Sequence, residues 1–333
     1  MMLRIGLLGA GRIGIVHAAA ITAHRDSALV AISDAFAENA EKLASQYGVA
    51  TATSDDILQD PNIDAVVIAT PTDTHSDLIE AATAAGKAVF CEKPVDLSLD
   101  RARACLNATK DSGQPVMVGF NRRFDPNFGH LKAALDAGEI GKSELLAITS
   151  FDPAPPPIEY IKVSGGLFRD MMIHDFDMAN FIMGALPQTI MATGSAIVDP
   201  AIGDAGDVDT AVATLTYADG RIAVIKNSRR AAFGYDQRIE VLGAKGMLQA
   251  QNVLENTVVK STADGVIGAK PTYFFLERYM PAYKAEWSAF VDAATGKADI
   301  PVSLQDGVNA LAMAEAATRS LATGAPVRLS DLD

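Results

Sequence analysis

The first 120 residues alternate short, wholly apolar runs with segments of helical periodicity. Apolar runs that lack polar alternation are typical of strands in a parallel sheet whose two faces are both covered by helices. This part of the chain therefore predicts a doubly wound α/β (Rossmann) domain over residues 1–120. The runs are Leu3–Leu8, Ala28–Ser33, Ala65–Ala69, Ala88–Cys91 and Val116–Phe120, and the helices are a segment through His17 and Ile21, Ala37–Tyr47, 75–85 and Asp100–Thr109.

Beyond residue 120 the pattern changes to a helix over HLKAALDAG and then to strands in which apolar and polar residues alternate. Alternation of this kind predicts antiparallel strands with one covered face. We therefore predict an α+β domain over residues 121–333 with a large, mostly antiparallel open sheet, its C-terminal helix able to pack back on the first domain. The strands are Glu144–Ser150, Ala211–Tyr217, Arg221–Ser228 and Arg238–Leu242, the closing helices Lys284–Thr295 and Leu304–Thr323, the loops 152–160 and 199–209, and the hairpin turn 218–220.

One predicted helix in the second half carries polar residues on an otherwise apolar surface. In GGLFRDMMIHDFD (165–177), Asp170, His174 and Asp177 recur at steps of four and three, which places them on one face of a helix. Leu, Phe, Met and Ile cover most of the remaining circumference, so we expect the helix to be buried nearly all round. Buried Asp and His are costly unless they are paired or used in the chemistry.

Composition narrows the class of protein. The 333 residues carry a formal net charge of -13, which disfavours binding to nucleic acid or anionic membranes. Cys91 and Cys105 form no CxxC pair, as expected in a reducing compartment. The N-terminus lacks the features of a signal peptide, and no apolar run is long enough to cross a bilayer. We expect a cytoplasmic enzyme that acts on a small molecule.

A dinucleotide motif follows the first predicted strand. Gly9, Gly11 and Gly14 form G-x-G-x-x-G, in which the glycines permit a tight turn, the approach of a pyrophosphate and close packing of helix on strand. The helix N-terminus adds free N–H groups. Asp34 ends the second strand, where a carboxylate accepts hydrogen bonds from the ribose 2′-OH and repels a 2′-phosphate. We therefore predict NAD rather than NADP, a preference that Arg12 would weaken. The alternatives are that the motif binds FAD, or that it is a glycine turn that binds no nucleotide.

Two further polar segments follow strands at the same edge of the predicted sheet. One is Thr70–His75, and the other is Glu92-Lys93-Pro94. Ligands of open parallel sheets bind beyond the carboxyl ends of the strands. Pro94 fixes its turn, which would aim Lys93 at this region from a rigid position. His75 is either a packing residue at a helix start or a contact to the cofactor.

The motifs GAGRIG, ATPTDTH, CEKP, NRRFD and GGLFRDMMIHDFD, in this order and spacing, resemble the Gfo/Idh/MocA oxidoreductases. The resemblance covers essentially the whole chain, including GYDQRIEVLGAKGML and FFLERYMPAYKAE, and is greatest to the inositol 2-dehydrogenases. It implies NAD-dependent oxidation of a ring carbinol of inositol (myo-inositol to 2-keto-inositol) or of a similar cyclic polyol. The loop 151–156 lacks a polar His/Asn pattern of some inositol dehydrogenases, which leaves the preferred isomer or sugar open.

The resemblance also implies roles for single residues. Lys93 matches the family's catalytic lysine, and Asp170 and His174 match its helix-borne pair. The chemistry itself requires a base at the carbinol oxygen, and His174 is the natural choice, with Asp170 holding its tautomer and Lys93 stabilising negative charge. The expected cofactor contacts are Gly9, Gly11, Arg12, Ile13, Gly14, Asp34, Thr70, Pro71, Thr72, His75, Glu92 and Lys93. The expected substrate contacts are Lys93, Asn121, Arg123, Asp170, His174 and Tyr235.

Several alternatives stay open. Arg123 suits a contact to a polyol hydroxyl and Asn121 suits shaping of the crevice, but interdomain salt bridges explain both residues equally well. Asp177 is a substrate contact or a helix support. Tyr235, Tyr279 and Tyr283 also suit aromatic packing. A metal site at Asp170, His174 and Asp177 has workable spacing, but we expect no metal, because hydride transfer to NAD needs none. Functional alternatives are an aldose 1-dehydrogenase of the same family, an NAD-dependent glycosidase with transient oxidation, and a redox-silent NAD-binding regulator. The resemblance also implies a homo-oligomer, a tetramer or a dimer.

Overall fold

The computed structural model describes residues 2–332, which form two compact units. The first unit runs to Asn121 and includes Ala282–Leu311, and the second contains Arg122–Pro281 and the chain from Ala312 on. Residues 282–311 thus group with the first unit, whereas the sequence alone divides the chain at 120/121. Among the described residues, we find no helix with the length and hydropathy of a membrane span.

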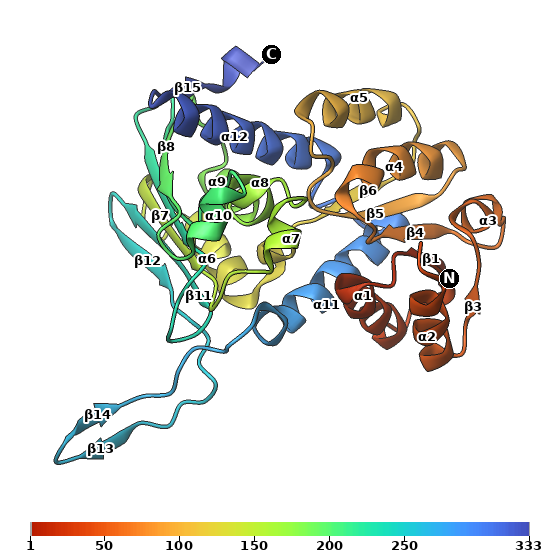
Figure 1. The fold of residues 1–333 in the computed structure, drawn as a ribbon, viewed down its shortest axis with the longest axis horizontal. Helices are drawn as coiled ribbons and strands as arrows, with labels where there is room; N and C mark the ends of the chain where they lie inside the picture. Colours follow the sequence, from red (N-terminus) through yellow and green to blue (C-terminus); the bar gives the residue numbers. More distant parts are fainter. Residues whose placement is uncertain (1, 333) are drawn as a thin grey trace. The chain divides into compact units, whose positions relative to one another are not determined.

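The first unit is built on a six-stranded parallel sheet of order β3-β2-β1-β4-β5-β6 (Figure 1). Helices α4 and α5 lie on one face of this sheet, and α1 and α2 lie on the other. The predicted doubly wound domain is confirmed. Its strands are β1 (Leu3–Leu8), β2 (Ser27–Ser33), β3 (Ala50–Thr51), β4 (Ala65–Ile68), β5 (Ala88–Glu92) and β6 (Val116–Gly119), and its helices are α1 (Arg12–Ala23), α2 (Ala37–Tyr47), α3 (Ser54–Gln59), η1 (Thr72–Thr74), α4 (His75–Ala84) and α5 (Leu99–Thr109).

The later part of α11 (Phe275–Ala294) completes the core of the first unit. Trp287 packs edge-on against Phe90 of β5, and its Nε1 donates a hydrogen bond to Ser27 Oγ at 3.0 Å. The prediction that this helix begins at Lys284 is wrong. The helix starts earlier and runs through Pro281, because burial of its apolar side chains outweighs the one backbone hydrogen bond that proline removes.

The second unit is built on a seven-stranded mixed sheet of order β12-β11-β7-β10-β9-β8-β15. Strands β7 and β10 pair in parallel and the other neighbours are antiparallel, as the predicted mostly antiparallel sheet requires. The strands are β7 (Ser143–Phe151), β8 (Thr189–Ser195), β9 (Thr210–Thr216), β10 (Ile222–Ser228), β11 (Asp236–Gly243), β12 (Gly246–Ala250) and β15 (Val327–Arg328).

The two faces of this sheet differ. Buried and exposed residues alternate along β9, β10 and β11, so one face forms the core of the unit. Helices α6 (Pro126–Asp136), α8 (Gly166–Asp170) and α9 (Ile173–Met183) lie on the covered side (Figure 1), and α12 (Leu304–Thr323) reaches β8, where Ser320 Oγ accepts a hydrogen bond from the Ala192 N–H. The open face carries several apolar side chains that are 36–49% exposed, namely Leu145, Met191, Val212, Ile222, Leu242 and Met247.

Two segments predicted as loops contain short helices. Residues 152–160 run into α7 (Ile158–Ile161), and residues 199–209 contain α10 (Pro200–Asp204). Each helix starts after a residue that favours an N-terminus: Pro157 precedes α7, and Asp199 caps α10 by accepting the N–H of Ala201. The hairpin β13 (Lys260–Thr262) and β14 (Gly265–Ile267) extends away from the sheet (Figure 1).

Candidate active site

The glycine motif forms a tight turn between β1 and α1. Gly9 has φ +100°, and a Cβ there would lie 2.3 Å from the carbonyl oxygen of Ala69. A Cβ on Gly14 would lie 2.0 Å from the carbonyl oxygen of Gly9, whereas one on Gly11 would meet nothing within 4 Å. The outer glycines are therefore required by the fold, and the middle glycine borders open space at the N-terminus of α1. That is the geometry of a pyrophosphate cradle.

Asp34 directly follows β2 and lies beside this turn. Its Oδ2 accepts a hydrogen bond from the Ala10 N–H at 2.7 Å, and its Oδ1 accepts one from the Phe36 N–H at 2.8 Å. The carboxylate therefore ties the end of β2 to the glycine turn and remains partly exposed. Arg12 and Ile13, in the same turn, are exposed and partly exposed respectively.

His75 links two loops of the first unit. Its ring is buried, with Nδ1 2.8 Å from the carbonyl oxygen of Pro94 and Nε2 2.9 Å from the carbonyl oxygen of Thr70. Both nitrogens are occupied by backbone oxygens, so the structure favours the packing role over a contact to the cofactor. The side chain fixes the loops that follow β4 and β5, where exposed Pro71 and partly exposed Thr72 lie.

Lys93 begins the turn after β5, and the Lys93–Pro94 peptide bond is cis. The preceding residue, Glu92, is 9% exposed and hydrogen-bonds His17 Nε2 through Oε1 at 2.7 Å. Its other oxygen accepts the backbone N–H of Lys93 at 3.3 Å. Glu92 thus anchors the turn to α1 and supports the backbone of Lys93. This role of His17 could not be predicted from the sequence. The predicted contact of Glu92 to the cofactor stays a prediction.

The predicted single helix over 165–177 is instead two helices. Helix α8 ends at Asp170, and α9 starts at Ile173 with His174 in its first turn. Between them, the N–H groups of Met171 and Met172 both donate to the carbonyl oxygen of Leu167, so the second bond spans five residues. This widened turn interrupts the helical repeat between Asp170 and His174, so their spacing of four does not by itself place them on one face. The prediction that the segment is buried nearly all round is confirmed.

Asp170 is held by two side chains that the sequence did not single out. Its Oδ1 accepts a hydrogen bond from the Tyr160 hydroxyl at 2.9 Å. Its Oδ2 lies 3.4 Å from both Nη atoms of Arg229, whose side chain is 1% exposed. Burial raises the pKa of nearby Asp152 to about 6, partly offset by the positive charge of Arg229 and reinforced by the negative charge of Asp170. Asp170 therefore belongs to a cluster of carboxylates around the guanidinium of Arg229.

The two arginines of NRRFD pair with two aspartates of α9. Arg123 donates to both oxygens of Asp177, with Nε–Oδ2 at 2.9 Å, and Asp177 is 1% exposed. This ion pair supports the helix and favours the structural interpretation of both residues over a substrate contact. Arg122, which the sequence analysis passed over, lies 2.5 Å from Oδ1 of Asp175. Burial raises the pKa of Asp175, an effect that the guanidinium of Arg122 opposes.

The remaining predicted substrate contacts are buried. Asn121 is 3% exposed at the start of the η2 turn (Asn121–Phe124). Tyr235 is 6% exposed and packs edge-on against Tyr279, whose hydroxyl donates to Gln237 Oε1 at 3.2 Å. Tyr283 lies edge-on to His17 in the first unit. Burial raises the pKa of Tyr235 well above its usual value. Aromatic packing accounts for these tyrosines.

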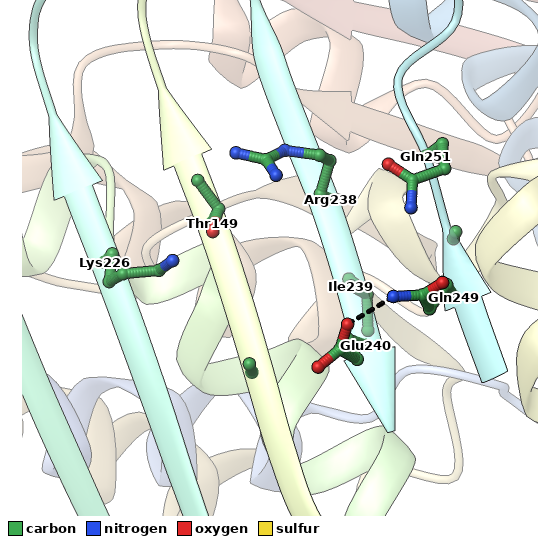
Figure 2. Close-up of a pocket in the computed structure, with 9 residues that line it drawn as sticks. Thr149, Lys226, Arg238, Ile239, Glu240, Gln249 and Gln251 are labelled. Carbon is green, nitrogen blue, oxygen red and sulfur yellow. Dashed lines mark hydrogen bonds between the residues drawn. The ribbon is translucent and has the colours of Figure 1, made fainter. Parts of the chain in front are cut away.

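A depression lies on the open face of the seven-stranded sheet, and none of the predicted site residues lines it. Figure 2 shows Thr149, Lys226, Arg238, Glu240, Gln249 and Gln251 around it, with Gln249 donating to Glu240. Arg238 is paired with Asp236 at 2.7 Å. Within residues 2–332, His, Cys, Asp and Glu form no group of three that suits a metal ion.

Comparison with known proteins adds to this geometry. A sequence model described as "Oxidoreductase family, NAD-binding Rossmann fold" matches residues 3–120, and one described as "GFO/IDH/MocA C-terminal domain" matches residues 128–249. The chain is 52% identical to inositol 2-dehydrogenase of Rhizobium meliloti over 97% of this chain and 98% of that one. It is 47% identical to myo-inositol 2-dehydrogenase of Thermotoga maritima, over 99% of each chain. The crystal structure of scyllo-inositol dehydrogenase from Lactobacillus casei with bound NAD(H) and scyllo-inositol matches with a TM-score of 0.92 at 30% identity, covering 99% of this chain and 100% of that one.

Proposed function

This chain belongs to the Gfo/Idh/MocA family of oxidoreductases, and from that premise we propose that it oxidises a ring carbinol of inositol to the ketone with NAD⁺. The similarity to inositol 2-dehydrogenase over nearly the full length of both chains carries the proposal. Myo-inositol, giving 2-keto-inositol, is the proposed substrate, because the two relatives with the highest identities reported above are inositol and myo-inositol 2-dehydrogenases.

The first unit has the features that NAD⁺ binding requires. Gly11 borders open space at the N-terminus of α1, so the backbone there can approach a pyrophosphate. Asp34 offers a partly exposed carboxylate to the ribose hydroxyls and opposes a 2′-phosphate. Thr70, Pro71 and Thr72 continue the same edge of the sheet beyond β4. Bound NAD⁺ supplies the acceptor for the hydride that leaves the carbinol carbon.

In the proposed chemistry, His174 and Asp170 act on the proton, and Lys93 stabilises the substrate oxygen from which the proton is taken. His174 takes the proton of the carbinol hydroxyl as the C–H bond breaks and the carbonyl forms. Asp170 stabilises the imidazolium that results. Lys93 donates a hydrogen bond to the same oxygen and stabilises the negative charge that develops on it. Lys93 extends from a turn held by Glu92 and His75, so its backbone is fixed before the substrate binds.

A direct assay tests this proposal. The purified protein is incubated with NAD⁺ and, separately, with myo-inositol, scyllo-inositol and D-glucose, and the absorbance band of the reduced cofactor is followed. We expect NADH to accumulate fastest with an inositol. Faster oxidation of D-glucose would replace the proposal with the aldose 1-dehydrogenase alternative. Absence of NADH with every substrate would leave the glycosidase or the redox-silent regulator, and release of an aglycone from a glycoside would separate those two.

We further propose that the protein is a homo-oligomer, a tetramer or a dimer. The support is the open face of the seven-stranded sheet, where Leu145, Met191, Val212, Ile222 and Met247 form an exposed apolar surface. Apolar patches of this kind commonly mark protein interfaces. Sedimentation velocity measures the assembly, and Ile222→Glu tests the face, with Val163→Glu as a control at an exposed apolar residue outside the sheet. A monomer for the unaltered chain would contradict the proposal.

A further inference from the structure

Arg229 is a buried cation shared by three carboxylates. It follows β10 directly, its side chain is 1% exposed, and both Nη atoms lie 3.4 Å from Oδ2 of Asp170. Its Nη2 is also 3.8 Å from Oδ2 of Asp207, and its charge opposes protonation of Asp152. Arg122 and Asp175 also act on Asp152. A guanidinium this deeply buried is stable only with anionic partners, so Arg229 and the carboxylates depend on one another.

The same cluster fastens the helix that carries Asp170. Asp207 Oδ1 accepts the N–H of Leu167 at 3.0 Å in the first turn of α8. Gly166 permits this approach, because it has φ +83° and a Cβ there would lie 2.8 Å from that oxygen. Asp207 thus binds the start of α8, Asp170 ends it, and Arg229 lies against both aspartates. The short helix is held at its two ends by one ionic cluster.

The two oxygens of Asp170 have separate partners. The Tyr160 hydroxyl donates to Oδ1 at 2.9 Å, and Arg229 lies against Oδ2. A carboxylate held at both oxygens cannot rotate freely. Since α8 is followed at once by the widened turn and His174, the orientation of Asp170 is set by these side chains and not by a continuous helix.

We infer that Arg229 is a positioning residue for the dehydrogenase reaction, which holds the carboxylate of Asp170 in a fixed orientation for its proposed role with His174. The inference rests on the proposed function. Arg229 acts through Asp170, so its loss should lower kcat more than it changes the KM for NAD⁺. It should also move the acidic limb of the pH profile to higher pH, because the guanidinium no longer lowers the pKa of Asp152, a member of the same cluster.

The test compares Arg229→Gln and Arg229→Lys with a matched control at the other end of the same strand. Arg221 directly precedes β10, is 15% exposed and pairs with Asp219, so Arg221→Gln removes a similar ionic contact away from Asp170. Asp207→Asn loosens Arg229 without removing a direct partner of Asp170. Kinetics with myo-inositol and NAD⁺ are measured from pH 5 to 9, and Asp170→Asn is measured in parallel.

We expect Arg229→Gln to lower kcat at least about tenfold and to raise the pH of the acidic limb, with Arg229→Lys intermediate, Asp207→Asn changed in the same direction by less, and Arg221→Gln within about twofold of the unaltered protein. If Arg229→Gln does not fold, Arg229→Lys and Asp207→Asn carry the test. Suppose that Asp170→Asn is inactive but the Arg229 variants match Arg221→Gln in kcat and pH profile. The inference about Arg229 would then be wrong, while the proposed role of Asp170 would stand. A fully active Asp170→Asn would overturn both it and the proposed role of Asp170.

Discussion

The glycine turn allows ligand binding and folding to be separated by two single substitutions. An alanine Cβ at position 11 meets nothing within 4 Å, and Gly11 has φ −72° and ψ −168°, which any residue adopts. An alanine Cβ at position 14 would lie 2.0 Å from the carbonyl oxygen of Gly9 and 2.9 Å from its carbonyl carbon. Backbone must therefore move by about 1 Å to accommodate Gly14→Ala, whereas Gly11→Ala needs no movement.

The magnitudes follow from this difference. Overpacking against backbone costs about 1–3 kcal/mol, so we expect Gly14→Ala to lower the free energy of unfolding of the cofactor-free protein by that amount. Gly11→Ala replaces a helix N-cap glycine and should cost less than about 1 kcal/mol. Its methyl group occupies the space proposed for the pyrophosphate, so the Kd for NAD⁺ should rise at least about tenfold, equivalent to about 1.4 kcal/mol.

Urea unfolding without NAD⁺ gives the stability of each variant, and calorimetric titration with NAD⁺ gives its affinity. We expect opposite effects of the two substitutions. Gly14→Ala should lower the free energy of unfolding, and Gly11→Ala should lower the affinity for NAD⁺. If Gly11→Ala bound NAD⁺ within about twofold of the unaltered protein, the open space beside Gly11 would not be the cofactor cradle. If it lost as much stability as Gly14→Ala, the distinction drawn from the two clashes would be wrong.

Three further predictions follow from named contacts. Lys93→Ala should lower kcat with myo-inositol at least about 100-fold while calorimetry shows NAD⁺ binding retained, and an unchanged kcat would remove the lysine from the mechanism. Asp34→Ala should narrow the ratio of kcat/KM for NAD⁺ over NADP⁺ at least about tenfold, since the repelling carboxylate is gone, and an unaltered ratio would contradict its role. Asp152 has its pKa raised from 3.8 to about 6, so the folded state holds the extra proton between these values and loses stability as pH rises through them. Asp152→Asn cannot undergo this loss of stability. The unfolding free energy of the variant minus that of the unaltered protein should therefore increase between pH 4 and pH 7, by about 3 kcal/mol at most. A difference that does not change with pH would refute the assignment.

The sequence predicted most of the first unit because its signals are local, although it missed β3 and α3. Apolar runs such as Ala65–Ile68 are buried on both faces and mark their strands directly, and the glycine turn and Asp34 lie where the motif places them. Fewer elements of the second unit could be predicted from the sequence. Strands β8 and β12 were missed, since Thr189–Ser195 and Gly246–Ala250 gain their strand conformation from neighbours in the sheet and not from their own pattern.

The site shows the same limit. Periodicity correctly predicted a buried segment with polar residues at 170, 174 and 177. It could not show that the helix is interrupted between Asp170 and His174. It also could not pair Arg229 with Asp170 or Arg122 with Asp175, because these partners are 59 and 53 residues apart in sequence. The signal for Arg229 was present in principle, as a charged residue directly after an alternating strand, but only the folded sheet shows which acid it meets.

The central claim is that a hydride passes from the inositol ring to the nicotinamide. The most direct measurement uses myo-inositol deuterated at C2 together with NAD⁺, with the products analysed by NMR. We expect one deuterium at C4 of the nicotinamide for each 2-keto-inositol formed. NADH without deuterium, deuterium released only into water, or unchanged inositol in the presence of bound NAD⁺ would contradict it.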